Sequence, residues 1–358
     1  MRRDLGNHIE YLENRLSDYT GHNLLQSLGF THEQDWVSEY FVTLAIIDRL
    51  SPNAQHLNIV FLDSTGMSFW IHVLPDYDLR LEIADHGFPK LKTLALQTNT
   101  RTEHSWHPNT ASFSTIFVEL GAAPKLSKIR ASGLVFGRAP SAWQPFANLQ
   151  SIDLTEVMSD FDDIDLVLGA CNKLKRFTCH WALLTLKLGN TVKELLPNII
   201  QHKDTLQTLW LVCSTVYLVS YHSPIINFNS LPRLTALKEV KLCNLCIPDR
   251  YSYYGCPPLG APPISCLVPP SIEHLTVMHS YLWAADGEYR DYQPSRLWDL
   301  VRDRTQSLPH LRELIIQIKS GTLSNWVQHE RRAVDMLTEE FRNVDVRFTL
   351  VSELDIFA

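Results

Sequence analysis

A leucine frame of the form L-x-x-L-x-L recurs through the chain and limits its possible folds more strongly than any other feature. The clearest copy is Leu311, Leu314 and Ile316, within residues 308–318, which read L-P-H-L-R-E-L-I-I-Q-I. The copies follow one another at intervals of roughly 23 to 39 residues, longer and less even than the roughly 20–29 residues of regular leucine-rich repeats. The ten copies begin at Ala54, Leu91, Leu126, Leu149, Leu174, Leu206, Leu237, Ile272, Leu311 and Phe341.

The frame predicts a short strand that needs neighbours to be stable. Alternate side chains of a strand point to opposite faces, so the last two apolar residues of each frame point inward and the residue between them points outward. The first leucine, three positions earlier, is expected to close the turn into the strand. Stacked repeats can bury these side chains at about 1.5–3 kcal/mol each, against a comparable loss of backbone entropy. An ordinary α/β sheet protein with leucine-rich strands is the alternative.

Helical patterns lie between several frames. Apolar residues fall at i, i+3, i+4 and i+7 in residues 113–120 and in residues 192–199, and Thr191 with Glu194 forms a capping box for the second set. A third pattern runs through residues 334–341. Strands that alternate with helices predict an α/β leucine-rich-repeat solenoid, a horseshoe of about ten irregular repeats. We expect parallel strands on its concave face and helices on its convex face.

The sequence divides into an end piece and a repeat region. Residues 1–52 do not follow the frame, although residues 8–12 are expected to form a first strand, and we interpret this piece as an N-terminal helical cap or first atypical repeat. Residues 53–358 are expected to form the leucine-rich-repeat domain, with inserted loops at about 248–270 and 281–296. A solenoid grows along one axis, so this length does not require a second domain.

Charge and cysteine content restrict the classes of function. A formal net charge of −7 at pH 7 argues against a general binder of nucleic acid or of anionic membranes. No apolar run reaches the length needed to span a membrane, and no secretory signal follows the first residues, M-R-R-D-L-G. Seven cysteines, an odd number, favour unpaired thiols in a reducing compartment. We therefore expect a cytoplasmic or nuclear protein.

Two insertions and one acidic segment interrupt the repeat rhythm. Residues 248–270 are rich in proline and tyrosine, and residues 281–296 carry aromatic residues, among them Trp283, Tyr289 and Tyr292, between charges. Long insertions on repeat proteins often lie on the binding side, and a packed cover over the edge of the solenoid fits these segments equally well. Residues 160–168 contain four aspartates, which we interpret as a helix start rather than a cation site, because the glycine and closing glutamate of a calcium loop are missing.

No sequence motif indicates catalysis or a cofactor. Cys243, Cys246, Cys256 and Cys266 resemble a zinc set, but only the first two have the usual ligand spacing. Cys243 also belongs to a strand that the leucine frame already explains, so unpaired thiols are the favoured interpretation. Phosphate loops, dinucleotide fingerprints and nucleophile elbows are not found in the sequence. We expect a non-enzymatic protein with no cofactor and no metal.

The outward positions of the strands are the candidate binding surface. Ten strands spaced by about 4.8 Å make a concave surface of order 45 Å. Trp210 is a large aromatic residue at an expected exposed strand position, and tryptophan and arginine often dominate binding energy. A merely solvated polar face is the alternative for any single residue. The candidate binding residues are Arg130, Asp153, Arg176, His180, Trp210, Lys241 and His274.

The uneven repeats, the frames F-P-K-L-K-T-L-A-L at 88–96 and L-P-H-L-R-E-L-I-I at 308–316, and the inserted aromatic loops resemble the leucine-rich-repeat region of fungal F-box proteins. The resemblance covers the chain from about residue 54 onward. In that family an N-terminal F-box docks on the adaptor of a cullin ubiquitin ligase, and the repeats recruit the substrate. No F-box is found in residues 1–52, where the L-P-x-E-[IL] opening is missing.

The resemblance implies a protein–protein interaction scaffold that serves as the substrate-recognition module of such a ligase. Its partners would be a protein substrate and the cullin ligase adaptor, with neither nucleic acid nor membrane. A stand-alone leucine-rich-repeat regulator or scaffold without a ligase link is the alternative, and an enzyme or small-ligand sensor is a remote one.

Overall fold

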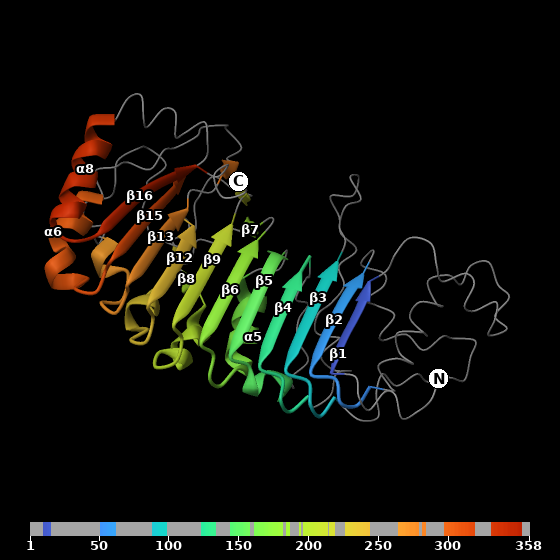
Figure 1. The fold of residues 1–358 in the computed structure, drawn as a ribbon. Coiled ribbons are helices and arrows are strands. Elements are labelled where there is room, and N and C mark those ends of the chain that lie inside the picture. Colours follow the sequence, from blue (N-terminus) through green and yellow to red (C-terminus); the bar gives the residue numbers. More distant parts are fainter. Residues whose placement is uncertain are drawn as a thin grey trace, which may run out of the picture. The chain divides into compact units, whose positions relative to one another are not determined.

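The chain is an α/β protein whose strands pair in parallel, as a computed structural model describes it (Figure 1). It falls into two compact units, which we call unit 1 (Met1–Ser159 with Ala170–Lys173) and unit 2 (Asp160–Gly169 with Leu174–Ala358). None of the sheets formed by the described strands closes into a barrel. The structure describes residues 10–15, 51–61, 88–98, 123–133, 144–157, 161–181, 184–186, 193–194, 196–213, 215–218, 226–243, 264–278, 281–283, 297–318 and 331–352.

Unit 1 contains five parallel strands in sequence order. They are β1 (Tyr11–Arg15), β2 (His56–Phe61), β3 (Thr93–Thr98), β4 (Lys128–Ser132) and β5 (Ser151–Val157). The second frame leucines pair in register, so that Leu57, Leu94, Ile129 and Ile152 form one inward row. The first strand, predicted at residues 8–12, is found three residues later as β1, where Tyr11 pairs with His56.

Unit 2 contains six further parallel strands. They are β6 (Arg176–Trp181), β9 (Thr208–Cys213), β12 (Glu239–Cys243), β13 (His274–Met278), β15 (Glu313–Ile318) and β16 (Arg347–Ser352), in that spatial order. Here too the frame sets the register, because Phe177 pairs with Leu209, Val240 with Leu275, and Leu275 with Leu314. A repeating parallel sheet, as the frame predicts, is confirmed.

The last predicted frame, at Phe341, Val344 and Val346, is wrong. The strand β16 begins only at Arg347, and its inward residue Phe348 pairs with Leu314. Phe341 instead lies on a helix, with its side chain fully buried. Apolar residues at helical spacing imitated the frame at this point.

The first leucine of a frame closes the turn into its strand, as expected. Leu91 donates its backbone N–H to Phe88 O at 3.1 Å, and Leu311 donates to Leu308 O at the same distance. The next backbone N–H groups reach across to the neighbouring turn, as Lys92 does to Gln55 O at 2.8 Å. These leucines are fully buried, so one residue both closes the turn and packs the core.

The described helices are fewer and shorter than the alternation of strand and helix predicts. The α-helices are α5 (Phe161–Ala170), α6 (Leu297–Ser307) and α8 (Arg331–Asn343). Short 3-10 helices occur elsewhere, at η2 (Gln144–Asn148), η3 (Pro197–His202), η4 (Leu231–Arg233) and η6 (Ile264–Cys266). Within the described residues, no helix has the combination of length and apolar character needed to cross a bilayer.

The α-helix predicted over residues 192–199 is not formed. Lys193–Glu194 is instead a short strand, β8, which pairs with β11 (Ile226–Asn227), and η3 begins at Pro197. A proline disfavours helical geometry in the residue before it, and Leu196 is indeed left-handed, with φ of 49°. The capping residue Thr191 and the helix predicted at 113–120 lie outside the described residues.

Two other sequence predictions of helices are confirmed. The pattern of Val334, Leu337 and Phe341 lies on α8, where Leu337 and Phe341 are fully buried. The acidic segment at residues 160–168 is a helix start, with Asp162 and Asp163 in the first turn of α5. Aspartates at that position stabilise the helix through its dipole.

A second, three-stranded parallel sheet lies at the carboxyl ends of unit 2 strands. It contains β7 (Leu184–Leu186), β10 (Thr215–Leu218) and β14 (Tyr281–Trp283), which follow β6, β9 and β13 along the chain. β10 pairs directly with β14, although β12 separates β9 from β13 in the larger sheet. The segments that follow β9 and β13 therefore pair with each other beyond β12, whose last residue, Cys243, is 1% exposed.

Candidate protein-binding face

The outward side chains of unit 2 form three rows across the strands, because the strands are in register. Inward neighbours such as Leu209 and Leu211 are fully buried, which fixes the direction of the rows. The first row contains Arg176, Thr208, Glu239, His274, Glu313 and Arg347. The second contains Thr178, Trp210, Lys241, Thr276, Ile315 and Thr349. The third contains His180, Val212, Cys243, Met278, Gln317 and Val351.

The third row is mostly closed off from solvent. Val212, Cys243, Met278 and Gln317 are at most 7% exposed although they lie on the outward side. Met278 and Gln317 occupy outward positions of the frame, where exposure would be expected, and the structure buries both of them. Most of the accessible outward residues therefore lie in the first two rows, which we call the outer face. Within this face, Thr178 is only 3% exposed.

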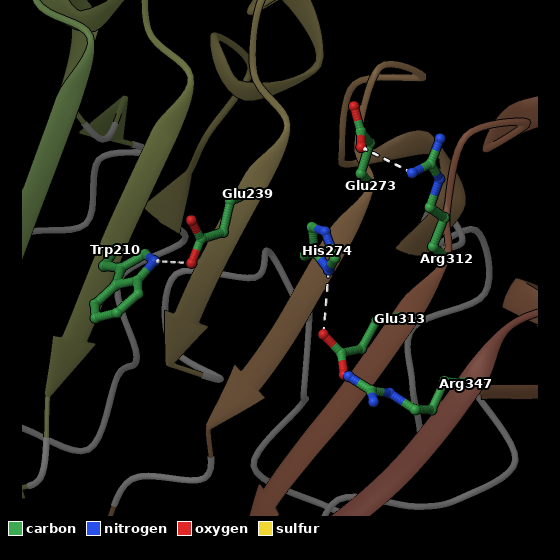
Figure 2. A network of polar contacts seen from close by, with 7 residues as sticks. All are labelled: Trp210, Glu239, Glu273, His274, Arg312, Glu313 and Arg347. Carbon is green, nitrogen blue, oxygen red and sulfur yellow. Dashed lines mark hydrogen bonds and ion pairs between the residues drawn. The ribbon is translucent and has the colours of Figure 1, made fainter.

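Trp210 lies in the middle of a cluster on three neighbouring strands of the outer face. The guanidinium carbon of Arg176 lies 4.8 Å from the centroid of the indole ring, and Lys241 Nζ lies 5.5 Å from it. The indole Nε1 donates a hydrogen bond to Glu239 Oε1 at 3.1 Å (Figure 2), and Thr208 Oγ1 donates to Glu239 Oε2 at 3.3 Å. We call these five residues the Trp210 cluster.

The geometry of the Trp210 cluster fixes the orientation of its tryptophan. Cation–π contacts contribute about 0.5–2 kcal/mol each, depending on how far the cation is removed from water. Lys241 is half-buried, and this burial lowers the pKa of its ammonium group below the usual value. The half-exposed indole is thus held in one orientation before any ligand arrives.

A second cluster surrounds Glu313 at the other end of the outer face (Figure 2). His274 Nδ1 lies 3.1 Å from Glu313 Oε2, and Arg347 Nη2 donates a hydrogen bond to Oε1. Burial raises the pKa of Glu313, but the hydrogen bonds from Arg347 and His274 outweigh it and hold that pKa below its usual value. Glu313 is therefore a partly buried anion with two hydrogen-bond partners, on a side chain that is 15% exposed.

A third group of charges lies where the strands begin. Glu273 forms one ion pair with Lys238 at 3.0 Å and another with Arg312 at 3.7 Å. The hydrogen bond from Lys238, followed by the charges of Lys238 and Arg312, lowers the pKa of Glu273. Both cationic side chains are more than half exposed, so water screens these pairs and their contribution to stability is small.

The structure brings together only some of the candidate residues from the sequence. Arg176, Trp210 and Lys241 share the Trp210 cluster, whereas His274 belongs to the cluster around Glu313. His180, in the third row, is half-buried and pairs with Val212 in the register.

Arg130 and Asp153 belong to unit 1 rather than to the outer face. They pair with each other in the register of β4 and β5, and Arg130 Nε lies 3.7 Å from Asp153 Oδ2. The Arg130 side chain is 60% exposed, so this is a solvated surface pair of small energetic value.

Four residues of the site were not among the candidates, namely Thr208, Glu239, Glu313 and Arg347. Glu239 and Glu313 occupy outward frame positions. Their hydrogen-bond partners are close in space but 29 to 39 residues away in the sequence, so no local pattern reveals the contacts. Arg347 was missed because the last frame was placed too early. In the structure, the pairing of β15 with β16 places Arg347 beside Glu313.

Nothing in the described residues builds a metal site. Cys243 is buried and Cys266 is exposed, while Cys246 and Cys256 lie outside the described residues. No group of three or more histidine, cysteine, aspartate or glutamate side chains within the described ranges could hold a metal ion. Asp165 is one of the four aspartates that were considered as a cation site. Its carboxylate accepts hydrogen bonds from the backbone N and the Nδ2 of Asn198, at 2.8 and 2.7 Å.

The buried cysteines of unit 2 lie in an environment that suppresses thiolate formation. Burial raises the pKa of Cys179 well above its usual value, and the nearby Cys213 and Cys243 add to this effect. In unit 1, burial raises the pKa of Cys171 to about 12. The five described cysteines form no disulfide.

Fold and site together define an α/β protein with an open parallel sheet that carries a mixed aromatic and charged face. No known family model matches the chain, and a search of curated proteins finds no similar protein.

Proposed function

We propose that the chain is a non-enzymatic protein-interaction scaffold of the leucine-rich-repeat class that binds a protein partner on the outer face. The observation that carries this proposal is the half-exposed Trp210, fixed by Arg176, Glu239 and Lys241 in the middle of that face. A solvated surface gains nothing from a large aromatic side chain, whereas tryptophan and arginine are the residue types that most often dominate binding energy. An indole already held in place loses little conformational entropy on binding.

The dimensions of the outer face favour a peptide segment of the partner over a broad globular surface. Six strands at about 4.8 Å spacing span about 24 Å, and the two accessible rows cover only about 7 Å along the strands. A standard interface buries about 800 Å² on each partner, which is more than this area supplies. An extended segment of about seven residues has the length of the outer face.

The resemblance to fungal F-box proteins gives this proposal a more specific form. In that form, the outer face recruits a substrate for a cullin-type ubiquitin ligase, and the ligase adaptor is a second partner. A scaffold or regulator without a ligase link is the competing form, and both use the outer face in the same way.

An affinity purification from a eukaryotic cell extract, analysed by mass spectrometry, tests the proposal and separates its two forms. Wild-type bait is compared with Trp210→Ala bait, which removes the indole, and with Arg130→Ala bait, which changes a solvated pair in unit 1. We expect partners that Trp210→Ala loses and Arg130→Ala retains. Recovery of the ligase adaptor supports the ligase form, and its absence beside other partners supports the stand-alone scaffold. Equal recovery with all three baits refutes the proposed face.

A further inference from the structure

The outer face is cationic although the chain as a whole is acidic. Its first two rows contain three cations (Arg176, Lys241 and Arg347) and two carboxylates (Glu239 and Glu313), a net charge of +1 with histidine neutral. The whole chain has a net charge of −7. The face therefore attracts ligands of the opposite sign to those expected from the overall composition.

Both carboxylates of the outer face are already engaged by the protein. Glu239 accepts hydrogen bonds from Trp210 and Thr208, and Glu313 is paired with Arg347 and His274. These contacts offset the negative charges locally and also occupy Arg347.

Arg176 and Lys241 are the two cations that remain. Among the described residues, no carboxylate forms an ion pair with either of them, and each is instead placed against the ring of Trp210. They come from β6 and β12, the strands on either side of β9, and their distances to the ring limit their separation to about 10 Å. Two like charges are thus held near each other at the half-buried ring of Trp210.

We infer that the outer face takes an acidic segment of the partner protein, with aspartate or glutamate side chains on Arg176 and Lys241 and the backbone crossing Trp210. This inference rests on the proposed function and adds the chemistry of the partner. Side chains two residues apart in an extended segment are spaced by about 7 Å, which two cations within about 10 Å can accommodate. An arriving carboxylate relieves the repulsion between these cations and restores a counter-ion to the partly buried Lys241.

A peptide-binding measurement on the full chain tests the inference. The probes are a fluorescein-labelled extended peptide of about eight residues rich in glutamate, and a matched peptide with glutamine in its place. Fluorescence anisotropy is recorded at low salt and at higher salt for wild type, Arg176→Gln, Lys241→Gln and Lys203→Gln. Lys203 is an exposed cation outside the outer face and serves as the matched control.

The glutamate peptide is expected to bind, and the glutamine peptide at least tenfold more weakly, since hydrogen bonds between charged groups are stronger than those of a neutral amide. Arg176→Gln and Lys241→Gln should each weaken binding about tenfold on the same grounds, and higher salt should weaken it further. Lys203→Gln should bind like wild type.

Other outcomes overturn the inference. Equal binding of both peptides, or equal loss in Lys203→Gln, means that the charges of Arg176 and Lys241 are not the determinant. Displacement of the peptide by a single-stranded oligonucleotide at lower concentration would assign the cations to nucleic acid instead. If extract partners are lost with Trp210→Ala but retained with Arg176→Gln and Lys241→Gln, the proposed function stands and the acidic segment is rejected.

Discussion

The indole nitrogen of Trp210 donates a hydrogen bond to Glu239 Oε1 at 3.1 Å, from one strand of unit 2 to the next. The two residues occupy different rows of the register, since Trp210 pairs with Lys241 and Glu239 pairs with Thr208. This diagonal contact keeps the carboxylate engaged and leaves the two neighbouring cations of the outer face without it.

Trp210→Ala should cost little stability while it removes binding. The half-exposed ring contributes through one hydrogen bond and two cation–π contacts, so we expect a loss of about 1–2 kcal/mol in the free energy of unfolding. Trp181→Ala is the matched control, because that ring is fully buried on the same sheet and its loss should cost about 3–5 kcal/mol. Urea denaturation followed by circular dichroism measures both. A loss for Trp210→Ala as large as for Trp181→Ala would mean that Trp210 is a core residue.

His202 should make the protein less stable in mild acid. Its side chain is fully buried, Nε2 lies 3.0 Å from Leu168 O, and Nδ1 has no hydrogen-bond partner among the described residues. Burial lowers the pKa of His202 below its usual value of 6.5, although the hydrogen bond to Leu168 acts in the opposite direction. The unfolded chain therefore binds the proton more readily, and stability falls as the pH drops from 6.5 towards the folded-state pKa.

Unfolding free energies of wild type and His202→Gln, measured between about pH 5 and pH 8, check this prediction. Wild type should lose stability through this range as the pH falls, and the variant should lose less, since its side chain does not titrate. Parallel curves for the two proteins would show that His202 does not set the pH dependence.

Glu313 should matter for stability more than Glu273, although each carboxylate has two side-chain partners. Glu313 is 15% exposed and its pKa is held low, so Glu313→Gln should cost about 1 kcal/mol near neutral pH. The sign follows from the lowered pKa: the contribution is present above the usual glutamate value of 4.5 and is lost as the pH falls through the lower folded-state value. For Glu273→Gln we expect a smaller loss at neutral pH, because the side chain of Glu273 is 23% exposed and its pairs are more strongly screened by water. Thermal unfolding of both variants at neutral pH compares them, and equal losses would contradict the role of burial.

The described cysteines should differ in reactivity according to burial. Cys266 is exposed, whereas burial raises the pKa of Cys171 to about 12 and that of Cys179 well above its usual value. At pH 8 iodoacetamide should therefore modify Cys266 within minutes and leave Cys171 and Cys179 unmodified until urea unfolds the chain. Peptide mass spectrometry gives the extent at each site. Native labelling of Cys171 at the rate of Cys266 would contradict the buried position.

The sequence predicts those parts of the fold that depend on local spacing. The pairing of Leu209, Val240 and Leu275 follows from the frame, because each copy carries the same alternation of inward and outward residues. The helix α8 follows equally from the spacing of Leu337 and Phe341.

The remaining features depend on contacts that no local pattern records. Pro197 overrides the helical spacing of its neighbours, since it begins a 3-10 turn after a left-handed Leu196. Burial of Met278 does not follow from the frame, because the alternation places it on the same outward side as the more exposed Thr276. The hydrogen bond that Glu313 accepts comes from Arg347 on β16. The start of this strand was misplaced in the sequence, because the helical residue Phe341 was assigned to the last frame.

Site-specific photo-crosslinking tests the central claim that the outer face contacts a partner. A benzophenone amino acid is placed at Thr276, which lies in the second row, and separately at Met336, which is 49% exposed on α8. After irradiation in cell extract, we predict a covalent adduct with a partner at Thr276, lost when Trp210→Ala is added, and no such adduct at Met336. Adducts at Met336 alone, or adducts at Thr276 that persist without the indole, would contradict the claim.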